Sequence, residues 1–324
     1  MNKIGAIDLI LDIATEAMNQ EQKKRLQEEK LRTLFQRVYE KSEFYREKMD
    51  KLKIDAEAKD VFGSLEKMPF TTDEDIKRCY PFGLLTMPVS GVAFFDYLLE
   101  EKIAAGFTLN DRMRRIETIC RSLVACDITM CSTLLIDSHG IGLDELNLMQ
   151  QAAERIGITV LINHDRDLVN MMAVLRDFGV TTLYTSTERS KNFGAYLNEN
   201  RQKCFLQSIL CNASHCNDQE KSDLETQFNI PVYRLYNVAE KLGLFIGSEC
   251  VHQEGIHIHD DYFYVEVINQ DGMALPYGES GELVVTTLSH EAMPILRYRT
   301  GKKAVMENSV CKCGRTSLKV QFFS

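Results

Sequence analysis

The chain has no tryptophan and no long apolar run among its 324 residues. Its apolar stretches, such as Leu134–Ile136 and Leu242–Ile246, are far shorter than the roughly 20 residues that a membrane-spanning helix needs. Excess basic charge is also missing, because 38 Lys and Arg residues stand against 47 Asp and Glu residues, for a net charge of −9. Nucleic-acid phosphates are neutralised by clustered Lys and Arg. We therefore expect neither a membrane nor a nucleic-acid partner.

A secretory signal is not visible at the start of the sequence. Asp8 and Asp12 occur before an apolar segment of the required length can form. The ten cysteines do not suggest a disulfide framework in a chain of this size. We expect a cytoplasmic protein with buried thiols and one possible metal site.

Sequence motifs for common catalytic and phosphate-binding sites are absent. The chain has no G-x-x-x-x-G-K-[ST] segment, and Gly140–Ile–Gly142 lacks a third glycine because position 145 is Glu. It has no G-x-S-x-G segment either. Ser214, His215 and Cys216 offer a nucleophile and a base, but side chains of adjacent residues seldom point at each other. These patterns predict no triphosphate cradle and no hydrolase triad.

The first part of the chain is predicted to be helical. Between residues 20 and 50, five apolar residues recur at i, i+3, i+4, i+7 and i+8, which is typical of an amphipathic helix docked on a larger body. They are Leu31, Leu34, Phe35, Val38 and Tyr39. Further on, Thr71 and Glu74 have the spacing of a capping box, which predicts a short helix that ends before Pro81.

From residue 127 to residue 240, short strand-like segments alternate with helical ones. This alternation indicates a mainly parallel sheet with helices on both faces. The predicted strands are 127–137, 158–163, 181–186, 204–211 and 231–236, and the predicted helices are 140–157, 168–178, 188–199 and 217–228. After residue 240 the helical patterns stop, and 242–248, 262–269 and 282–287 are predicted strands. We expect a helical segment at 1–85, an α/β lobe at 86–240 and a β-rich lobe at 241–324.

The sharpest chemical pattern combines Cys250, His257, Cys311 and Cys313. The Cys-Lys-Cys-Gly segment lets two thiolates face one metal, and six residues separate Cys250 from His257, which leaves room for a small loop. Three thiolates and one imidazole would form a closed structural zinc site. The other interpretation is a set of free thiols near a chain end. His252 and His259 stay open as alternatives to His257.

Two weaker patterns point to a bound ligand. Tyr236–Asn–Val–Ala–Glu240 follows the last predicted parallel strand, where ligands of open α/β sheets bind. The Tyr can stack on a flat ring and the Glu can hold Mg²⁺, although a buried Tyr and a Glu that starts a helix are common without a ligand. Arg297 and Arg299 flank Tyr298 and can bind an anion or form surface salt bridges.

Taken together, several stretches resemble the phenylacetate–coenzyme A ligase family of adenylate-forming enzymes. They follow the family's order over residues 30–315: LRTLFQRVYEKSEFY at Leu31–Tyr45, MPFTTDEDIKRCYPFGL at Met68–Leu84, ECVHQEGIHIHDDYF at Glu249–Phe263, GELVVTTL at Gly281–Leu288, PILRYRT at Pro294–Thr300, and CKCG. The resemblance implies the α/β fold of the family's large N-terminal domain, with parallel sheets flanked by helices plus a β-rich lobe. It also implies zinc at Cys250, His257, Cys311 and Cys313, and it makes a homodimer and an aromatic or acyl ligand reasonable.

The parts that the family uses for adenylation are mostly missing. The family's Ser-Ser-Gly-Thr-Thr-Gly-Lys loop has no counterpart in Val89–Asp96. Its Tyr-Gly-Leu-Ser-Glu segment is present as Tyr236 to Glu240, but with Ala239 in place of the hydroxyl residue. The family's Tyr-Arg-Thr-x-Asp holds both ribose hydroxyls through the Asp, and Lys302 stands at that position here. The C-terminal ligase domain with its catalytic lysine is expected to be absent, since the sequence ends at Ser324.

This contrast leads to two functional hypotheses. The first is a catalytically degenerate relative that keeps the fold and a structural zinc and acts as a binding or partner module, with Tyr236, Glu240 and Arg299 as a vestigial nucleotide site. The alternative is an active acyl- or aryl-adenylate-forming ligase whose C-terminal domain is supplied by a partner ligase subunit. Only the alternative requires ATP, Mg²⁺ and coenzyme A.

Overall fold

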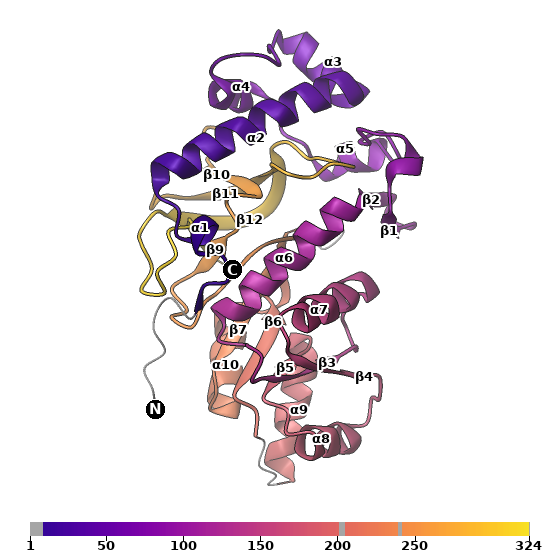
Figure 1. The fold of residues 1–324 in the computed structure, drawn as a ribbon, viewed down its shortest axis with the longest axis vertical. Helices are drawn as coiled ribbons and strands as arrows, with labels where there is room; N and C mark the ends of the chain where they lie inside the picture. Colours follow the sequence, from indigo (N-terminus) through magenta and orange to yellow (C-terminus); the bar gives the residue numbers. More distant parts are fainter. Residues whose placement is uncertain (1–8, 201–204, 239–241, 324) are drawn as a thin grey trace.

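One large sheet passes through the whole molecule. The computed structural model describes residues 9–200, 205–238 and 242–323 (Figure 1). Eleven of the described strands form this sheet in the order β10-β11-β12-β13-β9-β8-β7-β6-β5-β3-β4, and β1 and β2 form a separate hairpin. The α/β fold class predicted from the sequence is confirmed.

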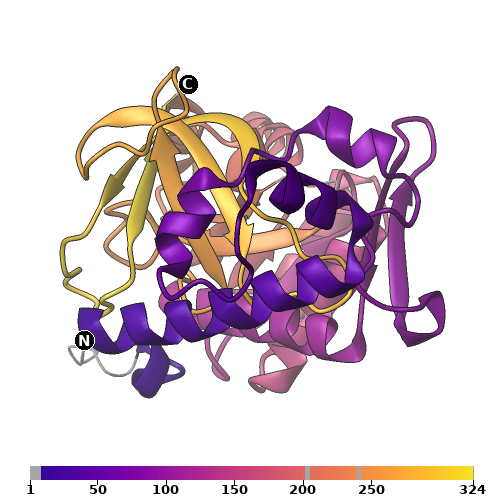
Figure 2. The ribbon, with the colours of Figure 1, turned by 90° about the horizontal axis from the view of Figure 1, so that it is seen from above.

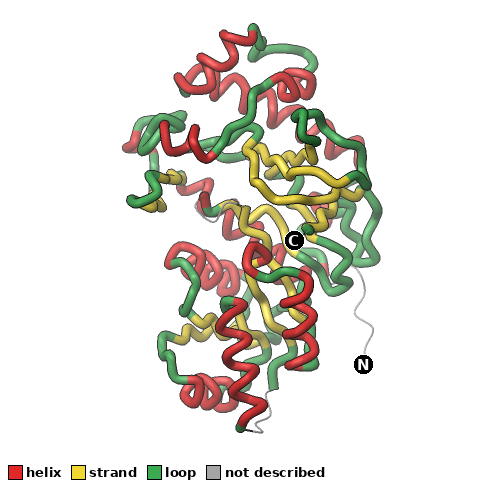
Figure 3. The backbone as a smooth tube through the Cα atoms, turned by 180° about the vertical axis from the view of Figure 1, so that it is seen from behind, coloured by secondary structure: helices red, strands yellow, loops and turns green. Residues whose placement is uncertain are grey.

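The lower half of the molecule in Figure 1 is a parallel sheet with helices on both faces. Side chains of β3 alternate between the two cores, because Leu134 and Ile136 pack with α6 and α7, whereas Leu135 packs with α8, α9 and α10. Figure 3 shows the opposite face of this half. The elements are α6 (Leu109–Ala125), β3 (Thr133–Asp137), α7 (Leu143–Arg155), β4 (Thr159–Asn163), α8 (Leu168–Asp177), β5 (Thr182–Tyr184), α9 (Thr187–Glu199), β6 (Ser208–Asn212), the 3-10 turn η3 (Ala213–His215), α10 (Asp218–Phe228) and β7 (Val232–Val238).

The upper half continues the sheet with antiparallel pairs from β7 across to the edge strand β10. β13 comes last in the chain but lies between β9 and β12, so the end of the described chain is built into the middle of this lobe. The strands are β8 (Leu244–Ser248), β9 (Ile256–Ile258), β10 (Phe263–Ile268), β11 (Ser280–Thr287), β12 (Tyr298–Glu307) and β13 (Lys319–Phe322).

The N-terminal helices lie over this antiparallel lobe. In Figure 2, α2 crosses the strands of the lobe as a long indigo helix. Leu31, Leu34, Phe35 and Val38 are buried on one side of α2, as their spacing predicts. The elements of this part are α1 (Ile13–Glu16), α2 (Gln20–Lys41), α3 (Glu43–Leu52), α4 (Val61–Lys67), α5 (Asp73–Arg78), the 3-10 turn η2 (Val89–Gly91), β1 (Phe94–Leu98) and β2 (Ile103–Phe107). No helix in the described ranges is long and apolar enough to cross a bilayer.

Two local predictions need correction. The capping box of α5 is made by Thr72 and Asp75 rather than by Thr71 and Glu74. Thr71 is drawn inward instead, because its hydroxyl donates to the Leu296 carbonyl at 2.7 Å and its backbone bridges Tyr298. The predicted strand at 127–137 is confined to β3, since Asp127 has a φ of 62° and the chain turns before Thr133.

Candidate functional site

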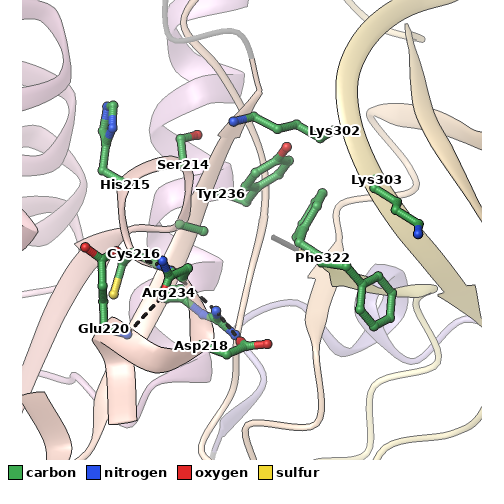
Figure 4. Close-up of a pocket in the computed structure, with 13 residues that line it drawn as sticks. Ser214, His215, Cys216, Asp218, Glu220, Arg234, Tyr236, Lys302, Lys303 and Phe322 are labelled. Atoms are coloured by element: carbon green, nitrogen blue, oxygen red, sulfur yellow. Dashed lines mark hydrogen bonds and ion pairs between the residues drawn. The ribbon is translucent and has the colours of Figure 1, made fainter. Parts of the chain in front are cut away.

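A cavity of about 430 Å³ opens at the carboxyl ends of β6 and β7 (Figure 4). Its near wall is η3 and the start of α10, and its far wall is formed by β12 and β13 of the antiparallel lobe. Open α/β sheets place their ligands at this edge. The lining residues are Ala213, Ser214, His215, Cys216, Asn217, Asp218, Glu220, Arg234, Tyr236, Lys302, Lys303, Phe322 and Phe323.

Tyr236 lies in this cavity with a second aromatic ring against it. The ring centroids of Tyr236 and Phe322 are 4.0 Å apart, with 34° between the ring planes. Only 2% of Tyr236 is exposed. A flat ligand can therefore stack on Tyr236 only if a protein side chain moves away first.

Two lysines give the far wall a positive charge. Lys302 and Lys303 come from β12 and are exposed at the cavity. In the part of the chain that the structure describes, neither ammonium group has a carboxylate partner. A ribose needs an acceptor for its hydroxyl protons, and an ammonium group can only donate.

Arg234 lines the cavity and belongs to a buried ion network behind it. Glu249 is fully buried and accepts from Lys221 Nζ at 2.8 and 2.9 Å and from Arg234 Nη2 at 2.9 Å. Arg234 Nη1 also donates to Asp218 at 2.7 Å. Burial alone would lower the pKa of Arg234, but the Glu249 carboxylate raises it above its usual value. The positive charge of Arg234 is therefore already neutralised by carboxylates of the protein.

Of the other two residues of the predicted nucleotide site, Arg299 does not line this cavity. Glu240 lies outside the described residues. Arg299 is exposed on β12 and binds the Glu282 carboxylate through two of its nitrogens, which is the surface salt bridge considered for it from the sequence. The hairpin of β1 and β2 contributes none of the described lining residues.

Ser214, His215 and Cys216 all line the cavity, and the Ser214 hydroxyl is not directed at the His215 ring. The Ser214 hydroxyl donates to the backbone carbonyl of Asn237 at 3.0 Å. His215 and Ser214 point in different directions in Figure 4. This agrees with the expectation that neighbouring side chains seldom face each other.

A second candidate site is a buried cluster of Cys250, His257, Cys311 and Cys313, whose ligand atoms all lie within 4.8 Å of one another. The sulfurs of Cys250 and Cys311 are 3.7 Å apart, and Cys313 Sγ is 3.6 Å from His257 Nε2. Gly314 follows with a φ of 89°, a conformation that glycine adopts without strain. Strands β8, β9 and β13 and the loop before β13 thus bring together residues that are up to 63 positions apart.

The donor set fits a tetrahedral zinc ion. Zn–S bonds of about 2.3 Å and Zn–N bonds of about 2.0–2.1 Å place neighbouring ligand atoms roughly 3.6–3.8 Å apart, which matches the two distances above. His257 Nδ1 is 3.1 Å from the Ser317 hydroxyl, an outer partner of the kind that orients a metal-bound imidazole. His252 and His259 lie outside the cluster, and His259 contacts the Ser122 hydroxyl at 3.2 Å.

Similar proteins of known function were found by sequence. The chain is 30% identical over 318 residues to the phenylacetate–coenzyme A ligase of Thermus thermophilus, covering 94% of this chain and 70% of that protein. The chain belongs to the phenylacetate–coenzyme A ligase family. The Escherichia coli ligase of the same name is 27% identical over 285 residues, covering 85% of this chain and 65% of that protein. No model of a protein family matches the chain.

Solved structures agree with the family on the fold. A 2-hydroxyisobutyryl-CoA ligase bound to its acyl-adenylate and CoA superposes with a TM-score of 0.85 at 17% identity, covering 98% of this chain and 78% of that chain. The amide bond synthetase McbA of Marinactinospora thermotolerans superposes with a TM-score of 0.53 at 14% identity, covering 72% of this chain. The chain has the fold of an adenylate-forming CoA ligase and spans about two thirds of the length of the curated ligases.

Sequence reasoning missed three features of the cavity: Phe322, Lys303 and the Arg234–Glu249 pair. Glu249 could have been found from the sequence, because it is the first residue of the stretch Glu249–Phe263 that carries the family resemblance. Phe322 carries none, since an aromatic residue near a chain end has no spacing relation to Tyr236.

Proposed function

We propose that this member of the family does not form acyl-adenylates and serves as a binding or partner module. The observation that carries the proposal is the Phe322 ring packed against a buried Tyr236. Tyr236 matches the family tyrosine that stacks on adenine. A base can reach it only by displacing Phe322, which costs the contact between the two rings, about 0.5–1.5 kcal/mol beyond the area they bury.

The surrounding charges support the same proposal. Lys302 stands where the family places a ribose-binding Asp, so two hydroxyl donors would face an ammonium group. No glycine-rich segment lines the described cavity, and the family's phosphate loop is missing from the sequence. Loss of one such preorganised contact typically costs about 2.7–4 kcal/mol of catalysis. Several losses together would leave adenylation negligible.

Calorimetric titration with Mg·ATP is the direct test, together with pyrophosphate exchange in the presence of a broad panel of carboxylic acids. We expect no binding heat and no exchange. A Phe322→Ala, Lys302→Asp variant supplies the matched comparison. It removes the ring that packs on Tyr236 and places a carboxylate at position 302 to accept from the ribose hydroxyls. Tight binding of Mg·ATP to the unmodified protein would contradict the proposal.

An active ligase completed by another chain is the second candidate function. The cavity of about 430 Å³ at the expected sheet edge favours it, because space for a ligand beside Tyr236 is kept. Exchange activity that appears only after the separate C-terminal domain of a family ligase is added would establish this function. A homodimer is compatible with either candidate.

We also propose that Cys250, His257, Cys311 and Cys313 hold one structural zinc ion. The support is the closed donor set, which leaves no ligand position for a reacting water. When bound, the metal would join the loop before β13 to β8 and β9. Metal analysis of the purified protein should give about one equivalent of zinc per chain.

A further inference from the structure

The side of α2 that faces the protein changes character halfway along the helix. Leu31, Leu34, Phe35 and Val38 are apolar, as a packed helix face requires. The same helical spacing continues toward the N-terminal end of α2 with Gln20, Lys23, Lys24 and Gln27, which are all polar. Lys23 and Gln27 are nevertheless buried. A polar surface therefore faces the apolar strands of the β lobe.

The polar half of α2 and the strands do not close on each other, and a cavity of about 610 Å³ lies between them. Its floor is apolar, with Val265 and Val267 of β10 and Met306 of β12 all buried. Phe62 of α4 and Tyr264 of β10 form an aromatic wall, with ring centroids 5.5 Å apart. Ligand pockets of about 300–1,000 Å³ combine apolar walls with a few polar groups in this way.

Most of the polar groups around this cavity already have partners. Lys23 Nζ pairs with the Asp260 carboxylate at 2.8 Å, and Gln27 donates to the Asp260 carbonyl at 2.6 Å. Gln20 donates to Asn308 and to the Thr316 carbonyl. These contacts fix the first turns of α2 and leave Lys24 as the one α2 residue at the cavity whose charge is not paired within the described ranges.

Lys24 and two tyrosines are the groups with spare hydrogen-bonding capacity. Across residues 9–200, 205–238 and 242–323, Lys24 Nζ has no carboxylate partner, and it lies 6.0 Å from the centroid of the Phe62 ring. The Tyr264 and Tyr277 hydroxyls have no hydrogen-bond partner within the same ranges. Burial raises the pKa of both tyrosines, so their hydroxyls stay protonated and can donate.

Of the two acidic residues that line the cavity, Glu266 is balanced by Arg297, whereas Asp60 keeps its negative charge. Both carboxylate oxygens of Glu266 are bound by Arg297, at 3.0 and 3.1 Å. Asp60 accepts from the Gly63 amide at 3.0 Å and caps α4. One ammonium group and two phenol donors therefore remain beside an apolar floor.

We propose that this cavity between α2 and β10 binds a small amphipathic carboxylate. Its apolar body would lie on Val265, Val267 and Met306 beside the Phe62–Tyr264 wall, and its carboxylate would be held by Lys24 with help from the phenol hydroxyls. The site lies apart from the cavity at Tyr236, and the two share no lining residue. The proposal therefore stands or falls independently of the proposed loss of adenylation.

The test uses 2-naphthoate as a fluorescent probe, because the chain has no tryptophan to interfere. We expect saturable binding that octanoate competes for and octanamide, its uncharged counterpart, does not. Lys24→Gln should weaken naphthoate binding about tenfold, as expected for one lost charge-assisted hydrogen bond. Arg25→Gln, one position along the same helix and paired outward with Glu21, is the matched control and should leave binding unchanged.

Three further variants make the test decisive. Ala274→Phe should block the cavity from its exposed rim and abolish binding. Asp60→Asn keeps the cap of α4 and should tighten carboxylate binding, whereas weaker binding would point to a zwitterion and overturn the proposal. Lys303→Gln in the other cavity should have no effect.

Naphthoate binding that responds to Lys303 and not to Lys24, or no saturable binding at all, would overturn the proposal. Displacement by octanoate identifies an aliphatic acid as acceptable, and failure of octanoate with retained naphthoate binding restricts the site to aromatic acids.

Discussion

The Cys–His cluster and the cavity beside Tyr236 lie on the same continuous sheet but differ in how completely the family's residues are kept. All four cluster residues are present and buried, and their ligand atoms lie within 4.8 Å of one another. The cavity keeps one tyrosine, covers it with Phe322 and turns a ribose acceptor into Lys302. The cluster joins strands of the fold, whereas the cavity would serve a reaction. Under the function proposed above, the fold is kept where stability needs it and altered where adenylation would need it.

The largest expected effect comes from breaking the cluster. The Cys311→Ser, Cys313→Ser double variant should lose its metal and at least about 5 kcal/mol of unfolding free energy, since structural zinc sites contribute about 10–16 kcal/mol of apparent binding energy in zinc-finger peptides. Metal analysis and urea unfolding measure both quantities. Cys131→Ser, at an exposed free cysteine, should change stability by no more than about 0.5 kcal/mol. Equal stability of the double variant and the control would show that the cluster is only a group of buried thiols.

The link between the two regions can be tested at Glu249, which neighbours Cys250 in sequence and binds Arg234 in the cavity. Glu249→Gln leaves Lys221 and Arg234 without their buried counter-charge. The expected loss is about 3–5 kcal/mol, typical of a broken buried ion pair. Urea unfolding gives the loss, and metal analysis shows whether the cluster is affected as well. Arg176→Gln, at an exposed pair with Asp177, should be nearly neutral. If Glu249→Gln lowered the free energy of unfolding by no more than Arg176→Gln does, solvent would have to reach the Glu249 network.

A pH titration tests the contact between α6 and the β lobe at His290, which belongs neither to the Cys–His cluster nor to the cavity beside Tyr236. Burial is the largest influence on His290 and lowers its pKa from 6.5 to about 4. Between these values the unfolded chain binds a proton that the folded protein does not, so stability should fall as pH falls from 6.5 to 4, by about 3 kcal/mol in total. Urea unfolding at pH 6.5, 5 and 4 measures this slope. His290→Phe should flatten the slope, and an unchanged slope in that variant would assign the pH response to other groups.

The smallest effect is expected where the cavity is altered. Phe322 lies half-buried at the end of β13, so Phe322→Ala should cost about 1–2 kcal/mol, less than removal of a fully buried Phe. Metal content should not change, because β13 stays paired with β9 and β12 through its backbone. Urea unfolding and metal analysis on the same sample compare the two regions directly. Loss of metal in this variant would show that the cluster and the cavity are not separable.

The parallel half of the fold could be predicted because its signals are local. Alternating apolar patterns and helix caps depend on near neighbours in sequence, and Asn217 with Glu220 forms a capping box at the start of the helix predicted at 217–228. The box at α5 was misplaced by one residue, because Thr71 bonds to Leu296, which is 225 positions away. A distant partner of this kind leaves no trace in local spacing. The same reason hides the contact between Phe322 and Tyr236.

The candidate sites show the same division. The spacing and types of Cys250, His257, Cys311 and Cys313 indicate a metal site from the sequence alone, although the choice among His252, His257 and His259 stays open there. The hydrogen bond of His259 to Ser122 on α6 is a tertiary contact, and sequence spacing contains no information about it. The polar inward face at Gln20–Gln27 looks like an ordinary solvated helix in the sequence. Its partners at Asp260 and Thr316 are what make it a cavity wall.

The sequence alone determined the α/β class, the family resemblance, the cysteine and histidine set and the missing phosphate loop, because each depends on residue type and short-range spacing. The tertiary structure decided which histidine joins the cysteines, which ring covers Tyr236 and where α2 leaves a cavity over the β lobe. The physical reason is that the covalent chain keeps sequence neighbours close in space, so local patterns can be read from residue types and spacing. Contacts between residues tens to hundreds of positions apart are fixed instead by the packing of whole elements, and packing follows from shape and burial summed over the entire fold.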